Sequence, residues 1–161
     1  MKSIIRNFHS SDYVPIQLDD TFLKQQKVDA TDDNRLKKEI QRQVDQQNGK
    51  IGYGGWLEKR SLYAKNPLFD QQQKRNIHLG YDFWCEEGEA VIAPLDGKIL
   101  SIKNNAQKGD YGPTIILEHH LCYQKIYTLY GHLSIESLSI HQRGDEIKSN
   151  EVVGFIGEMQ V

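Results

Sequence analysis

The second half of the chain consists of short apolar runs separated by turn residues, and this pattern restricts the fold more than any other feature. From Ile77 onward, segments rich in Val, Ile, Tyr and Thr alternate with Gly, Asp, Asn and Pro, as is typical of β-strands and turns. The intervals are too short for the crossovers of roughly 12 residues that parallel strands need. We therefore expect a mainly β protein with an antiparallel β-sandwich or barrel-like core. Strands are predicted at His78–Trp84, Ala90–Ala93, Gly97–Lys103, Thr114–His119, Lys125–Tyr130, Glu146–Ile147 and Val152–Ile156.

The first half of the chain contains one clear helical pattern. Leu36, Ile40 and Val44 recur at every fourth position and line one face of a helix predicted over Asp33–Gln47. The opposite face carries Lys, Arg, Glu and Gln, which favour contact with solvent. We expect the apolar face to pack against the rest of the protein.

The segments on either side of this helix have no strong period. Residues 1–31 are mixed and polar and are interpreted as an irregular arm with one short strand at Val14–Leu18. The Gly-rich stretch Ile51–Trp56 lacks the pattern of a phosphate-binding loop and is interpreted as a loop or bulge. The chain is therefore divided into an N-terminal arm and helix, residues 1–50, and a β domain, residues 51–161.

Charge and hydropathy exclude several classes of partner. Lys and Arg number 20 against 22 Asp and Glu, without the basic surplus that a nucleic-acid-binding protein needs. No apolar run approaches the roughly 20 residues of a membrane-spanning helix. Met1–His9 has no apolar stretch of the kind found in secretory signals. The sequence therefore predicts a cytoplasmic location, or a periplasmic or cell-wall one if a leader precedes it.

The two cysteines, Cys85 and Cys122, form no metal-binding or redox motif. They are interpreted as reduced thiols packed as small hydrophobic groups. A single disulfide between them is the alternative.

The segment His78–Asp82 carries two side chains of the types that bind zinc, an imidazole and a carboxylate. On a straight strand the two residues would lie about 13 Å apart, too far to share one ion. We therefore expect the backbone to bend at Gly80, so that His78 and Asp82 converge. The alternative is a surface histidine and an aspartate that pairs elsewhere.

His132 follows a glycine at the end of a predicted strand and is a candidate for acid–base catalysis, because an imidazole titrates near neutral pH. An ordinary packed or solvated histidine is the alternative. His119 and His120 are adjacent and face opposite sides of a strand, so both are interpreted as structural.

Six segments resemble, in order and spacing, the lysostaphin-type zinc endopeptidases, which cleave peptide bonds in bacterial cell-wall peptidoglycan. They are His78–Asp82, Gly88–Gly97, Asp110–His119, Tyr127–Leu133, Gly144–Lys148 and Val153–Gly157. The resemblance implies a β-rich sandwich core, the duplicated hybrid motif of this family. It also implies that His78 and Asp82 are zinc ligands, that His132 is catalytic, and that the substrate is a peptide or peptidoglycan.

The family also has an H-x-H segment, one strand further on, which supplies a second catalytic histidine and the third zinc ligand. No H-x-H occurs among the 161 residues. Because catalytic zinc normally has three protein ligands, we expect a polypeptide of these residues to bind zinc weakly and to lack peptidase activity.

Two other functions stay open. The first is a non-catalytic relative that binds a partner or a wall peptide. The second is a phosphocarrier, since a similar β-sandwich in sugar-uptake phosphotransfer proteins uses a pair of facing histidines. Asp82 counts against the phosphocarrier because a carboxylate repels a phosphoryl group.

Overall fold

The computed structural model describes residues 3–60, 77–107 and 109–158. The chain divides into two compact units. The first, called the β unit, comprises Met1–Ser10 and Glu86–Gln160; the second, called the αβ unit, comprises Ser11–Cys85. The sequence-based boundary between residues 50 and 51 stays a prediction.

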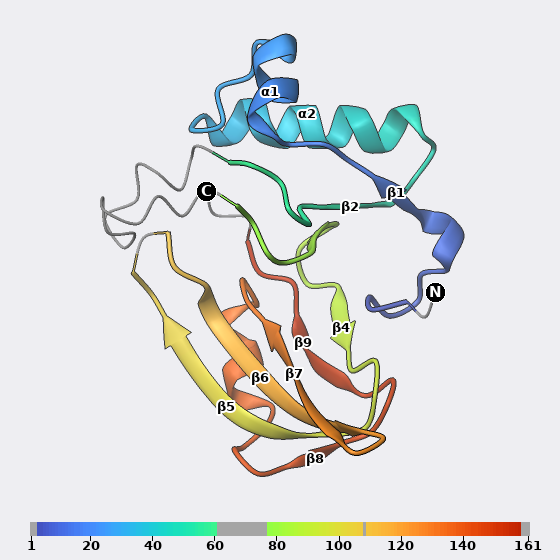
Figure 1. The fold of residues 1–161 in the computed structure, drawn as a ribbon, viewed down its shortest axis with the longest axis vertical. Helices are drawn as coiled ribbons and strands as arrows, with labels where there is room; N and C mark the ends of the chain where they lie inside the picture. The colour runs from blue at the N-terminus through green and yellow to red at the C-terminus, as the bar shows by residue number, and fades with distance from the viewer. Residues whose placement is uncertain (1–2, 61–76, 108, 159–161) are drawn as a thin grey trace. The chain divides into compact units, whose positions relative to one another are not determined.

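The β unit is built on an antiparallel sheet with the strand order β7-β6-β5-β8. Strands β5, β6 and β7 lie side by side in Figure 1. A two-stranded antiparallel sheet pairs β4 with β9. The elements are β4 (Ala90–Ile92), β5 (Gly97–Asn105), β6 (Gly112–Leu121), β7 (Gln124–Tyr130), the 3-10 helix η3 (Ile135–Ser139), β8 (Glu146–Ile147) and β9 (Val152–Phe155).

The core of the β unit comes from the alternation of apolar residues along these strands. Inward-facing side chains, including Ile99, Ile115, Leu117 and Val153, are almost completely buried. Each fully buried aliphatic side chain contributes roughly 1.5–3 kcal/mol to folding. The prediction of a mainly β protein with antiparallel strands is confirmed, and each strand predicted from Ala90 onward is present.

The αβ unit contains a three-stranded sheet in the order β1-β2-β3. Helix α2 packs along β2, where Gly52 permits close approach because a Cβ atom there would lie 3.1 Å from Val44. The predicted helix is confirmed: Leu36, Ile40 and Val44 are all buried. The elements are the 3-10 helix η1 (Ser10–Asp12) at the start of the unit, β1 (Tyr13–Pro15), α1 (Asp20–Gln26), α2 (Asp33–Gln46), β2 (Ile51–Gly54) and β3 (Asp82–Trp84).

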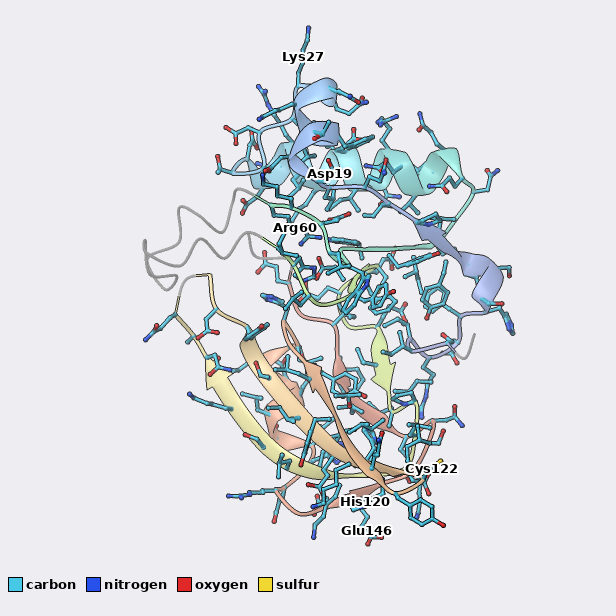
Figure 2. All side chains as sticks on the ribbon, in the orientation of Figure 1. Asp19, Lys27, Arg60, His120, Cys122 and Glu146 are labelled. Carbon is cyan, nitrogen blue, oxygen red and sulfur yellow. The ribbon has the colours of Figure 1, made fainter. Side chains whose placement is uncertain are left out.

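Three features of this unit differ from the sequence-based expectation. Helix α1 was not expected within the arm; Asp19 begins it by accepting hydrogen bonds from two backbone N–H groups, and Lys27 ends it in the left-handed conformation (Figure 2). This helix has seven residues and one buried side chain, Leu23, so its sequence shows no repeat of apolar residues. The stretch predicted as a loop contains β2, and β2 pairs in parallel with β1. The connection through both helices supplies the long crossover that a parallel pair needs.

The cysteine interpretation is confirmed in one respect and wrong in another. No disulfide joins Cys85 and Cys122. Cys122 is exposed rather than packed, because it occupies a left-handed position (φ 56°) in the turn between β6 and β7 (Figure 2).

Glu39 on α2 gives a test of stability against pH. Its carboxylate accepts hydrogen bonds from Arg42 Nη2 at 2.6 Å and Gln43 Nε2 at 3.0 Å, and the Arg42 hydrogen bond chiefly lowers the pKa of Glu39 below 4.5. As pH falls, the unfolded chain therefore binds a proton at Glu39 before the folded chain does. The contribution of ionised Glu39 to the free energy of unfolding is complete above the ordinary pKa of glutamate, and it is lost as pH falls through the lowered pKa of the folded state.

We expect Glu39→Gln to lower the free energy of unfolding by about 1 kcal/mol at pH 7, a modest figure because Arg42 is half-exposed. Urea unfolding of both proteins at pH 7 and pH 3 measures the difference. It should shrink at pH 3, because the unfolded chain has by then bound the proton that folded Glu39 binds less readily. An undiminished difference would contradict the assignment.

Candidate metal centre

The side chains of His78 and Asp82 converge within the αβ unit. The backbone bends at Gly80, and only the last three residues of the predicted strand His78–Trp84 form β3. His78 Nε2 lies 3.5 Å from Asp82 Oδ1. A Cβ atom on residue 80 would lie 3.3 Å from Nε2, so glycine also keeps space open beside the ring. The predicted bend and convergence are confirmed.

The imidazole of His78 is oriented by a backbone carbonyl of the residue that follows β2. Its Nδ1 lies 2.9 Å from the carbonyl oxygen of Gly55. Because a carbonyl only accepts hydrogen bonds, Nδ1 carries the proton and donates it. Metal-binding histidines usually donate their second ring N–H in this way, which fixes the tautomer. The contact therefore turns the ring so that Nε2 is directed toward Asp82.

Gly55 is the residue that this contact requires. It has φ 95°, in the left-handed region that favours glycine, and an added Cβ atom would lie 2.6 Å from His78 Nδ1. A side chain here would displace the imidazole and strain the backbone.

The second oxygen of Asp82 faces an arginine. Arg60 Nη1 lies 2.7 Å from Asp82 Oδ2. Oδ2 is buried and forms no hydrogen bond with the described residues, so this contact is an ion pair without hydrogen-bond alignment. Arg60 is itself held by Glu58 Oε2, to which it donates from Nε at 3.1 Å and Nη2 at 2.7 Å.

The geometry fits two positions of a zinc site. Ligand atoms about 2.0–2.2 Å from a tetrahedral ion lie about 3.4 Å from one another, close to the 3.5 Å between Nε2 and Oδ1. Within residues 3–60, 77–107 and 109–158 there is no cluster of three or more His, Cys, Asp or Glu side chains able to hold a metal.

His132 belongs to the β unit and lies two residues after the end of β7. Its backbone is in the left-handed conformation (φ 53°). Its N–H donates to Tyr111 at 2.7 Å, and its carbonyl accepts from Gly157 at 3.1 Å. The Tyr111 ring lies beside the imidazole, with centroids 6.4 Å apart. Its catalytic role stays a prediction, as do the roles of His78 and Asp82 as ligands.

His119 and His120, both on β6, have the structural environments expected of them. His119 is completely buried, with Nδ1 2.9 Å from the Asp96 carbonyl and Nε2 2.7 Å from Thr128 Oγ1. His120 is exposed and lies 3.1 Å from a carboxylate oxygen of Glu118.

Sequence reasoning assigned no supporting role at this site to Gly55, Glu58 or Arg60. The available signal was the cluster of glycines at positions 52, 54 and 55, since adjacent glycines often mark a close approach of the backbone to another group.

Comparison with known families places this geometry in context. The family model of Peptidase family M23 matches residues 76–161, just over half of the chain. The protein therefore belongs to this family, whose members are zinc metallopeptidases, and the predicted lysostaphin-type resemblance is confirmed. Comparison with the curated proteins and with the solved structures gave no match. No helix in the described part of the chain is long and apolar enough to cross a membrane.

Proposed function

We propose that the protein is a zinc metallopeptidase that hydrolyses peptide bonds, with the peptides of peptidoglycan cross-links as its substrate class. One observation carries this proposal: His78 Nε2 and Asp82 Oδ1 lie 3.5 Å apart, with the imidazole oriented by the Gly55 carbonyl. Membership of Peptidase family M23 supports it.

Each residue has a distinct proposed task. His78 and Asp82 would hold zinc, which when bound supplies a Lewis acid for the peptide carbonyl and activates water. His132 would hold or transfer a proton at its imidazole during attack on the peptide bond. The fixed Nδ1–H of His78 keeps Nε2 available as a ligand.

A non-catalytic relative that binds peptide without cleaving it is the second candidate. It is favoured by the lack of a three-ligand cluster among the described residues. The phosphocarrier alternative has less support, because a carboxylate oxygen lies 3.5 Å from Nε2 of His78 and would repel a phosphoryl group there.

Zinc binding by variants tests the ligand assignment. We expect His78→Gln and Asp82→Asn each to weaken zinc binding at least tenfold, because each removes one of two ligands. His120→Gln is the matched control, since His120 is exposed and pairs with Glu118. Competition with a chromogenic chelator gives the affinities. Equal affinity in all four proteins would refute the metal centre.

Incubation with cross-linked wall peptides then separates the candidate functions. Release of new amino termini supports the peptidase. Saturable peptide binding without new termini supports the non-catalytic relative. Incorporation of labelled phosphate at His78 would overturn both.

A further inference from the structure

We propose that the segment Gly55–Arg60, which precedes the family match, positions the two metal ligands, with Arg60 acting as the positioning residue for Asp82. This inference rests on the proposed function, because it assigns a task toward the same metal. All its contacts lie within the αβ unit.

The backbone of this segment runs beside the ligand-bearing segment. β2 pairs with β3 so that Gly54 lies opposite Asp82. Beyond β2, His78 donates its backbone N–H to Glu58 and accepts from Leu57 with its carbonyl, both at 2.9 Å. The indole of Trp56 stacks on the Tyr81 ring, with centroids 5.7 Å apart and planes 11° from parallel. The two segments therefore hold each other in register on both sides of Gly80.

Arg60 connects the two carboxylates of this region. Its Nε and Nη2 donate to Glu58 Oε2, and its Nη1 faces Asp82 Oδ2. The side chains of Arg60 and Glu58 are each only 14% exposed, so solvent competes little for these contacts. Figure 2 labels Arg60 among the side chains that follow β2. A guanidinium fork fixed in this way has one orientation, unlike a flexible ammonium group.

This arrangement decides which oxygen of Asp82 faces the histidine. The terminal torsion of an aspartate is broad and roughly two-fold, so the carboxylate needs a partner to hold it. Arg60 takes Oδ2, which leaves Oδ1 directed at His78 Nε2. The carboxylates of Glu58 and Asp82 and the guanidinium of Arg60 together carry a net charge of −1. The site therefore keeps the negative charge that attracts a divalent cation.

Glu58 also contacts the connection between β1 and α1. Its Oε1 accepts a hydrogen bond from the backbone N–H of Leu18 at 3.3 Å, and Leu18 is buried. These contacts link four residues in series. Leu18, Glu58 and Arg60 lie outside the matched range 76–161, and Asp82 lies within it. The N-terminal half builds the support of the centre, and the matched half supplies its ligands.

Zinc affinity of full-chain variants tests Arg60. We expect Arg60→Gln and Arg60→Lys each to weaken zinc binding about 10–100-fold, the usual cost of losing a group that orients a ligand. Lysine keeps the charge but lacks the planar fork whose separate nitrogens contact Glu58 and Asp82. Arg42→Gln is the matched control, because Arg42 donates from Nε and Nη2 to Glu39 in the same unit but outside the centre. Circular dichroism confirms that each variant is folded.

The sign of the change discriminates between two roles. If Arg60 only repels the metal ion through its charge, Arg60→Gln will bind zinc as tightly as the wild type or more tightly, and that result overturns the proposal. Zinc binding that is lost in His78→Gln but unchanged in both Arg60 variants also overturns it, while leaving the proposed function intact.

A measurement without metal tests Gly55. In the zinc-free protein, NMR of the His78 ring should show an Nδ1–H group held in a hydrogen bond by the Gly55 carbonyl. Gly55→Ala should weaken or abolish this hydrogen bond, because the new Cβ atom would lie 2.6 Å from that nitrogen. Gly88→Ala is the control, since Gly88 has a similar φ of 84° and no atom within 4 Å of the added carbon. An unchanged Nδ1–H hydrogen bond in Gly55→Ala would refute the positioning role whether or not zinc binds.

Discussion

Replacing His132 with alanine, in a form of the protein that carries an H-x-H segment, is expected to lower turnover by about 10²–10⁴ and leave zinc affinity nearly unchanged. That range is the usual effect of removing a positioned acid–base group. The ring is not needed to hold the local backbone, because the N–H and carbonyl of His132 bond to Tyr111 and Gly157 through the main chain. Single-turnover cleavage of a wall peptide and a zinc competition assay give the two quantities.

The matched variant is His132→Asn. His132 has φ 53°, a conformation that asparagine tolerates better than alanine, so this variant removes the proton-transferring group with the least backbone strain. We expect the same loss of turnover and an unchanged melting temperature. Loss of zinc together with activity would instead make His132 a ligand and overturn its assignment as the proton-transferring group.

A polypeptide of residues 1–161 is expected to bind zinc with a dissociation constant above about 1 μM and to show no peptidase turnover. His78 and Asp82 supply two ligands, and the remaining coordination positions would be taken by water. A full zinc site with four protein ligands is worth roughly 10–16 kcal/mol, or about 3 kcal/mol per ligand. Adding an H-x-H segment after Val161 should therefore tighten binding by about 10².

Calorimetric titration of both polypeptides measures this difference. The control is an extension in which both histidines of the added segment are glutamine, because it has the same length without the ligands. Stoichiometric sub-micromolar binding by residues 1–161 alone would mean that a third ligand lies within this chain.

Much of the candidate centre could be predicted from local pattern. The bend at Gly80 followed from the spacing of His78 and Asp82, since one ion requires a short distance between ligands. The helix over Asp33–Gln46 followed from the period of its apolar residues. Both inferences use neighbours within a few positions of one another, where chain geometry alone relates sequence to space.

The sequence by itself determined that the chain has an antiparallel β core and one long amphipathic helix, and it predicted that His78 and Asp82 converge if they share one ion. The tertiary structure decided that β4 pairs with β9, that β1 and β2 run in parallel, and that Arg60 and the Gly55 carbonyl hold the ligand pair. The physical reason is that these contacts join residues about 20 to 60 positions apart. Local periodicity carries no information about such pairings, which depend on how the whole unit buries its apolar surface and satisfies its buried polar groups.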